Sequence, residues 1–132
     1  MIVDTSVWIE FFRSTGSTAD RALRERIGAH GRIVIPDVVL GEVLVGTTDE
    51  LRAARLERTL SQFEIAPVAP VADAQSAARI QRSCRRQGQT VRNLIDCYVA
   101  AAGLRLGLPV LHRDRDFDVM ARCVGLQTVS AL

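Results

Sequence analysis

The sequence predicts one α/β domain in which a short, mainly parallel sheet lies between two layers of helices. Short apolar runs rich in Val and Ile alternate with longer segments whose apolar residues recur at helical spacing. Such alternation is typical of β-α units, whose parallel sheets are covered by helices on both faces. The chain has 132 residues, 48% of them hydrophobic, and no repeat or linker divides it. We therefore expect a single domain over residues 1–132.

The first elements are a buried strand and two helices. Residues 1–4 are short, apolar and β-branched and end on Asp4, which indicates a strand. Ser6 is a suitable N-cap for the helix that the apolar stretch 7–12 forms. After a polar loop, a second helix is expected over residues 18–30.

Glycine and proline punctuate the middle of the chain. A β-branched run lies between Gly31 and Pro36, and a helical pattern that begins directly after this proline stops at Gly46. A further helical pattern and a short apolar run follow. The elements expected here are a strand over 33–35, helices over 37–46 and 49–61, and a strand over 63–66.

The last third has the clearest pattern, because glycine follows each helical segment as a C-terminal cap. These glycines are Gly88, Gly107 and Gly125. The elements expected here are helices over 71–87 and 91–106, a strand over 109–111, a helix over 117–124 and a final strand over 127–129.

Composition narrows the class of protein. All 17 basic residues are arginine, with a formal net charge of +2. A GC-rich genome explains the missing lysine, but the planar guanidinium also suits phosphate recognition, and both explanations stay open. Three cysteines without CxxC spacing argue against a disulfide framework and a zinc site. With no apolar run of membrane-spanning length and no signal-peptide pattern, we expect a cytoplasmic protein.

Acidic residues follow two of the predicted strands. Asp4 ends the first strand, and Asp114 and Asp116 come shortly after the strand over 109–111. In open parallel sheets, ligands bind beyond the carboxyl ends of the strands. This edge of the sheet is therefore where we expect a functional site.

Two more acids, Glu42 and Asp96, interrupt apolar helical patterns. A carboxylate among apolar neighbours is rarely buried unless it is paired or binds a metal. Plain structural roles stay open as well: Asp4 as a turn or N-cap residue, Glu42 on a solvent-facing side, and one acid after residue 111 as a helix start. Asp96 is the hardest to explain in this way, because apolar residues crowd it.

Four converging carboxylates would repel one another, which raises their pKa values and destabilises the fold unless a cation is present. A hard divalent ion removes the conflict, and Mg²⁺ or Mn²⁺ suits an all-carboxylate site. Such a centre serves phosphodiester hydrolysis, because a bound metal lowers the pKa of water and stabilises the transition state. The residues alone thus predict a divalent-metal phosphodiesterase without a covalent nucleophile.

Four segments in this order resemble those of the PIN-domain family. They are Val3-Asp4-Thr5-Ser6, Pro36 with Glu42-Val43, Arg92-Asn93-Leu94-Ile95-Asp96, and the run from Leu111 to Phe117. The resemblance covers essentially the whole chain and implies a PIN-like three-layer α/β/α fold. Length and organisation further resemble the VapC-type toxins of bacterial toxin–antitoxin pairs.

The resemblance also implies a role for each site residue. Asp4 and Asp96 would be direct metal ligands, Asp114 would complete the metal set, and Glu42 would be a further catalytic acid. Asp116 would be an outer acid that acts through water. The supporting polar residues implied are Thr5, Ser6, Asn93 and His112.

His112 departs from the family pattern, which often has Thr or Ser at this position. It either orients water or phosphate or is a neutral side chain at a strand end.

The activity implied is Mg²⁺-dependent endonucleolytic cleavage of RNA, which blocks translation until a cognate antitoxin binds. The antitoxin would bury a segment in a groove of the toxin and place a basic side chain near the acids. Homodimers are common in the family. Trp8, Phe11 and Phe12 would serve either such an interface or the core.

A basic segment precedes Asp96. Arg79, Arg82 and Arg86 fall on one helix face, and Arg92 lies between that face and the acid. Several phosphate contacts would give salt-dependent RNA binding, and guanidinium groups also stack on unpaired bases. A solvated helix face is the equally open alternative.

Two other phosphate-handling classes do not match. Receiver domains hold a phosphoryl group with lysine, which this chain lacks, and haloacid-dehalogenase-type phosphotransferases have a second Asp where this chain has Ser6. The alternative that stays open is a PIN fold retained as a catalytically silent RNA-binding or regulatory module.

Overall fold

A computed structural model describes all 132 residues, and its centre is a five-stranded parallel sheet of order β3-β2-β1-β4-β5. The strands are β1 (Ile2–Val3), β2 (Val34–Pro36), β3 (Glu64–Ala66), β4 (Val110–His112) and β5 (Thr128–Ser130). The helices are α1 (Thr5–Arg13), α2 (Thr18–Gly28), α3 (Asp37–Leu44), α4 (Glu50–Leu60), α5 (Ala72–Arg86), α6 (Leu94–Leu106) and α7 (Arg115–Val124). The predicted α/β class and parallel sheet are confirmed.

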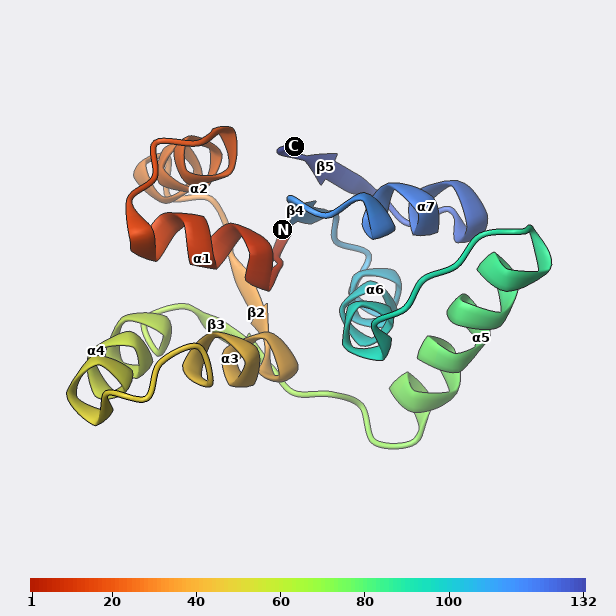
Figure 1. Cartoon of the computed structure of the whole chain (residues 1–132), viewed down its shortest axis with the longest axis horizontal. Helices are drawn as coiled ribbons and strands as arrows, with labels where there is room; N and C mark the ends of the chain where they lie inside the picture. Colours follow the sequence, from red (N-terminus) through yellow and green to blue (C-terminus); the bar gives the residue numbers. More distant parts are fainter.

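The helices form two groups, as Figure 1 shows, with α1 to α4 on one side and α5 to α7 on the other. Helix α1 packs on α2 and α3, whereas α5 packs on α6 and α7. Because the connections between parallel strands are right-handed, the two groups cover opposite faces of the sheet. The predicted three-layer arrangement is therefore confirmed.

The strand order reverses between β1 and β4, which places a crevice beyond their carboxyl ends. Val3 pairs with Leu111, and the Asp4 N–H donates to the Leu111 carbonyl at 3.0 Å. Asp4 and His112 therefore leave the sheet at adjacent positions. This register brings the two ends of the sequence to one place.

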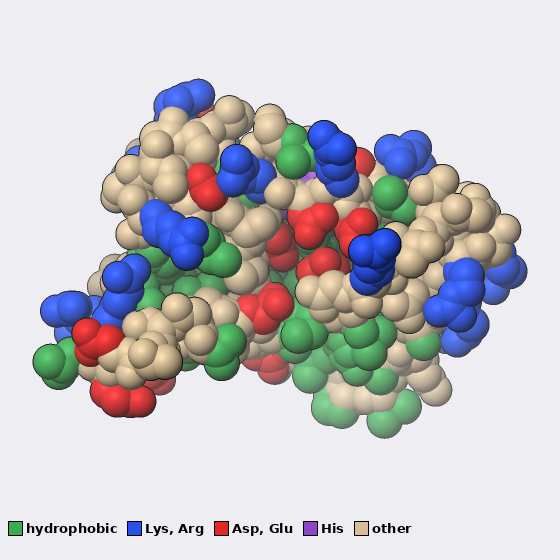
Figure 2. Space-filling model, in the orientation of Figure 1, with side chains coloured by type: hydrophobic (Ala, Val, Ile, Leu, Met, Phe, Trp, Pro, Cys, Tyr) green, Lys and Arg blue, Asp and Glu red, His purple; other side chains and the backbone are tan.

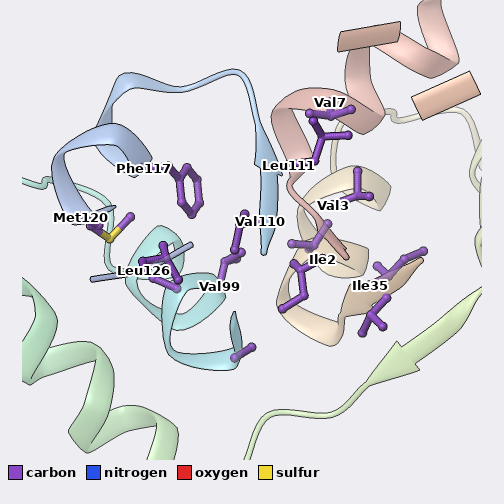
Figure 3. Packing of buried hydrophobic residues seen from close by; sticks show 14 of the residues in the cluster. Ile2, Val3, Val7, Ile35, Val99, Val110, Leu111, Phe117, Met120 and Leu126 are labelled. Carbon is purple, nitrogen blue, oxygen red and sulfur yellow. The ribbon is translucent and has the colours of Figure 1, made fainter. Parts of the chain in front are cut away.

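The core fills both sides of these central strands. Figure 3 shows Ile2 and Val3 next to Leu111, with Phe117 and Met120 on the side of α6 and α7. Every one of these side chains is at most 2% exposed. Burial of a large apolar side chain stabilises a fold by about 1.5–3 kcal/mol. The strand ends that carry the acids are thus held on a rigid base.

The starts of α1, α6 and α7 differ from prediction. Helix α7 begins at Arg115 instead of residue 117, because Asp114 caps it by accepting the Asp116 N–H at 2.9 Å. Ser6 is not the N-cap of α1, because α1 begins at Thr5 and the Asp4 side chain accepts the Ser6 N–H at 2.9 Å. Helix α6 begins at Leu94 instead of residue 91, because Asn93 caps it by accepting the Ile95 N–H at 3.0 Å. In each case the polar residue directly before the helix caps it by accepting a backbone N–H of the first turn.

Trp8 is a core residue. It is fully buried and its ring lies 5.8 Å from Phe12 and 5.2 Å from Phe63. An intermolecular role for Trp8 is therefore wrong, whereas Phe11 and Phe12 are partly exposed. None of the helices has the length and apolar character that a membrane crossing requires.

Candidate metal centre

Asp4 stands at the carboxyl end of β1 and is only 3% exposed. Its Oδ2 accepts hydrogen bonds from the Ser6 backbone at 2.9 Å and the Ser6 hydroxyl at 2.5 Å, but its Oδ1 is buried without a partner. Burial raises the pKa of Asp4, the Ser6 hydrogen bonds oppose this shift, and the charge of Asp114 adds to it. One oxygen of this carboxylate thus lacks the partner that a buried charge needs.

Asp96 lies in the first turn of α6 and is 6% exposed. Asn93 Nδ2 donates weakly to its Oδ1 at 3.4 Å. Burial, together with the charges of neighbouring carboxylates, raises the pKa of Asp96 to about 8. These neighbours are Asp4, Asp114, Glu42 and Asp116. The five acids predicted from the sequence therefore act on one another in one region.

Figure 2 shows this region as a group of acidic side chains in the hollow between the two halves of the molecule. Glu42 lies on α3, where its Oε1 accepts the Thr5 hydroxyl at 2.7 Å. Asp114 caps α7, since its Oδ1 accepts the Asp116 N–H at 2.9 Å. Burial and the charge of Asp114 raise the pKa of Asp116, while Arg92 lowers it.

The other two buried acids have a different environment. Asp20 lies 2.6 Å from the Arg24 guanidinium, and Asp73 lies 3.0 Å from that of Arg105. Neither Asp4 nor Asp96 has an ion pair. A buried carboxylate is costly without a cation beside it, and no side chain of the protein supplies one to Asp4 or Asp96.

The carboxylates do not close around a single point: no three His, Cys, Asp or Glu side chains are placed to ligate one ion together. The three-ligand set expected from Asp4, Asp96 and Asp114 is therefore not assembled by the side chains alone. Asp4 and Asp114 each turn one oxygen toward the first turn of their own helix. Mg²⁺ commonly uses one or two carboxylates and keeps several waters, so oxygen donors in this arrangement fit that ion.

The polar residues predicted to support the acids lie within hydrogen-bond distance of them. The Ser6 hydroxyl, besides bonding Asp4, accepts the Arg113 N–H at 3.0 Å. His112 is fully buried, and its Nδ1 accepts the Asp114 N–H at 3.2 Å. Burial lowers the pKa of His112, and the carboxylate of Asp118 opposes this shift. Thr5, Ser6, Asn93 and His112 thus each contact one of the predicted acids.

The predicted arginines divide into two groups. Arg79, Arg82 and Arg86 line a groove of about 480 Å³ formed by α5, α6 and α7, and none of the five acids lines it. Arg92 is exposed and acts on Asp116 instead. The structure therefore brings Arg92, but not the other three, to the acidic region.

Two acids that contact residues next to the site, Glu10 and Asp118, were not among the predicted site residues. Glu10 pairs with Arg113 at 2.9 Å, and Asp118 lies 3.4 Å from His112 Nε2. Asp118 alternates with Asp114 and Asp116 in the sequence, but that spacing indicates a helix start and not a contact with His112. Nothing in the sequence indicated Glu10, because its partner is 103 residues away.

A second groove borders the acids on the other side. Its lining combines apolar side chains, two arginines and the acid Glu42, and its volume is about 90 Å³. The residues that line it are Ile9, Phe12, Arg13, Glu42, Val43, Gly46, Thr47, Arg52 and Leu56. Its walls come from α1, α3, the turn after α3, and α4.

Comparisons with known proteins show which family the chain is similar to. A family model described as "PIN domain" matches residues 1–122. Ribonuclease VapC11 of Mycobacterium tuberculosis is 39% identical over 131 residues, covering 98% of both chains. VapBC-5 from the same species superimposes with a TM-score of 0.71 at 26% identity, covering 98% of this chain and 96% of that one. VapBC2 from Rickettsia felis gives 0.77 at 15% identity, with 98% and 96% covered, and supports the fold.

Proposed function

The chain belongs to the PIN-domain family, and from that premise we propose that it is a Mg²⁺-dependent endoribonuclease, the toxin of a VapBC-type toxin–antitoxin pair. It would act as one domain over residues 1–132, in the cytoplasm, and inhibit translation by cutting RNA. A relative that is 39% identical over nearly its full length is named a ribonuclease, which supports the choice of RNA as substrate.

One observation carries the metal part of this proposal. Asp4 and Asp96 are buried without an ion pair, although the two other buried acids each have an arginine. The missing positive charge is therefore specific to the crevice between β1 and β4. A divalent cation is the group that would supply it there.

The roles of the acids follow from their contacts. Asp4 Oδ1 is the oxygen best placed to bind an ion, because Oδ2 is already held by Ser6. Asp96 is the second direct ligand and loses its proton when an ion binds, since its pKa without one is about 8. Asp114 completes the metal set.

Glu42 and Asp116 surround that set, as the further and the outer acid. Mg²⁺, or Mn²⁺ in its place, would supply activation of a water nucleophile and charge neutralisation at the phosphate. Glu42, which accepts the Thr5 hydroxyl, and Asp116 would accept protons or hold water at the rim.

The arginines would bind the phosphates of the RNA. Arg92 stands beside Asp116 and would hold the phosphate nearest the cut. The groove with Arg79, Arg82 and Arg86 would hold more distant phosphates, with apolar Leu104 and Val124 in its lining. RNA that reaches both would extend from the acids to the groove between α5, α6 and α7.

The cognate antitoxin would bind the groove between α1, α3 and α4. Apolar Phe12 and Leu56 suit a buried protein segment, and Glu42 in the wall is an acid of the site itself. An occupant that carries a basic side chain would pair with Glu42 and block the acids. We also propose that the protein forms a homodimer, whose interface does not include the buried Trp8.

The test of this function is cleavage of a defined single-stranded RNA in Mg²⁺, in Mn²⁺ and in EDTA. We expect cleavage with either ion, none in EDTA, and none for Asp4→Asn or Asp96→Asn. Asp20→Asn is the matched control, because Asp20 is a buried acid that already has an arginine. Wild-type rates in folded Asp4→Asn and Asp96→Asn proteins would refute the metal centre.

A second candidate function is an RNA-binding or regulatory module without catalysis. The observation that favours it is the absence of a closed ligand set around one point. This candidate predicts RNA binding that neither EDTA nor Asp96→Asn alters, and no RNA cuts under any divalent ion. The same cleavage assay, run beside a filter-binding assay, separates the two functions.

A further inference from the structure

His112, the last residue of β4, has two ring nitrogens with different environments. Nδ1 accepts the backbone N–H of Asp114 at 3.2 Å. A nitrogen that accepts a hydrogen bond carries no proton, so the ring is neutral and its proton is on Nε2. The tautomer of this fully buried histidine is thus fixed by the turn that follows the strand.

The opposite nitrogen faces an acid. Nε2 is buried without a well-formed hydrogen bond, and Asp118 Oδ1 lies 3.4 Å away. The Asp118 side chain is 32% exposed and therefore has room to move closer to the Nε2 proton. The ring of Phe117 packs on the imidazole, with 5.1 Å between centroids. These contacts hold the ring plane from a second direction.

We propose that His112 is a positioning residue of the acidic centre, which, anchored by Asp118, fixes Asp114 through its backbone N–H. The Asp114 side chain in turn accepts the Asp116 N–H at 2.9 Å. Hydrogen bonds to both the backbone and the side chain of Asp114 therefore hold the turn from β4 into α7. This inference rests on the proposed function, because it matters chemically only if Asp114 belongs to the metal set.

A histidine does what a shorter side chain at this position cannot. A Ser or Thr hydroxyl would also accept the Asp114 N–H, but it would not reach Asp118 on the first turns of α7. The imidazole spans from the strand end to that helix. The same side chain therefore sets the direction of α7 and the place of the Asp114 carboxylate.

The test compares His112→Asn with His112→Leu, whose side chains have the same number and branching of heavy atoms. Asn retains an acceptor for the Asp114 N–H and Leu does not. We expect His112→Leu to lose about 10–100-fold in Mg²⁺ affinity by calorimetry, as outer-shell changes commonly do. His112→Asn keeps the acceptor for the Asp114 N–H but loses the contact with Asp118, so its affinity should fall between those of His112→Leu and the wild type. Equal affinities for the two variants would overturn the inference.

A second pair of variants keeps the test sharp if His112→Leu fails to fold. Asp118→Ala removes the anchor from Nε2, whereas Asp118→Asn keeps an oxygen that accepts its proton. We expect Asp118→Ala to lower Mg²⁺ affinity more than Asp118→Asn does. An order reversed or absent contradicts the role of Asp118.

Histidine-selective ¹⁵N NMR reads the geometry without any metal. The chain has only two histidines, and exposed His30 serves as the internal reference. We expect a bare Nδ1 and a protonated Nε2 at His112, and the same tautomer in Asp118→Ala with a shifted Nε2 signal, because the Asp114 N–H still donates to Nδ1. A protonated Nδ1 in the wild type would refute the positioning contact.

The outcomes separate this inference from the proposed function. If the wild type binds no divalent ion, the proposed function fails, and the role for His112 fails with it. If the wild type binds Mg²⁺ but His112→Leu binds it equally well, only the inference fails. If His112→Leu binds Mg²⁺ more weakly than His112→Asn and Nδ1 is unprotonated in the wild type, the result supports both the inference and the proposed function.

Discussion

The hydroxyl of Ser6 accepts the backbone N–H of Arg113 at 3.0 Å and so joins segments 107 residues apart. The same hydroxyl donates to Asp4 Oδ2 at 2.5 Å. One side chain therefore holds the acid at the end of β1 and the backbone that leads to Asp114. The place of each carboxylate depends on both ends of the chain.

Removing this hydroxyl should affect stability and activity together. Ser6→Ala loses both hydrogen bonds, so we expect the free energy of unfolding to fall by about 1–2 kcal/mol in urea titrations. RNA cleavage should fall about tenfold or more, because Asp4 loses one of its two anchors. Ser61→Ala is the control, since the Ser61 hydroxyl donates only to Glu57 on an exposed helix end. Equal effects from both variants would contradict the link.

Metal-free protein should lose stability as the pH rises. Asp96 has a pKa of about 8 when folded, so between about pH 4 and pH 8 the folded state holds a proton that the unfolded state releases. The midpoint of thermal unfolding in EDTA should therefore decrease from pH 6 to pH 8.5. The raised pKa of Asp4 and that of Asp116 act in the same direction.

The same measurement has two built-in comparisons. Asp96→Asn should flatten the pH profile, because the neutral amide does not titrate. Mg²⁺ should stabilise the wild type more at pH 8 than at pH 6, since ion binding at low pH must displace the Asp96 proton. A wild-type profile that rises through this interval would disprove the assignment.

Two buried acids should respond to the same substitution with opposite sign. At pH 8 without metal, Asp96→Asn removes charge repulsion and should raise the free energy of unfolding. Asp73→Asn breaks an ion pair and should lower it by about 1–3 kcal/mol, less than a fully buried pair because solvent screens Arg105. Urea unfolding in EDTA measures both. A loss of stability in both variants would argue against repulsion at Asp96.

The sheet and its active edge could be predicted from the sequence because they depend on local patterns. The apolar run over residues 33–35 predicted a strand, which the structure has one residue later as Val34–Pro36. The acids after β1 and β4 follow from the strand order. Helix starts were less predictable. Asp4, Ser6 and Asn93 are all suitable caps, and only the three-dimensional backbone decides which one satisfies the first turn.

Pairing across the chain was beyond sequence reasoning. Asp20 and Asp73 have the same residue type as Asp4 and Asp96, and all four are buried. The Asp20–Arg24 pair has the i,i+4 spacing of one helix, but the partner of Asp73 is 32 residues away, and only the structure shows that pair. The groove at Arg79, Arg82 and Arg86 likewise became separate from the acids only when α5 was placed against α6 and α7.

The groove arginines should set the salt dependence of RNA binding. Replacing Arg79, Arg82 and Arg86 by Ala removes three phosphate contacts, so the slope of log affinity against log salt should decrease in magnitude by about 2 for single strands. Filter binding at several salt concentrations, with the catalytically impaired Asp96→Asn as background, measures this slope. A control triple of exposed arginines away from the groove is Arg21, Arg55 and Arg58. An unchanged slope in the groove variant would remove RNA from that surface.

The central claim is that Asp4 and Asp96 together bind a divalent cation. Calorimetric titration of Mn²⁺ into wild type, Asp4→Asn, Asp96→Asn and Asp20→Asn tests it most directly. We expect Asp4→Asn and Asp96→Asn each to lose more Mn²⁺ affinity than the roughly 10–100-fold typical of an outer-shell change, while Asp20→Asn retains wild-type affinity. Wild-type Mn²⁺ affinity in folded Asp4→Asn and Asp96→Asn proteins would contradict it.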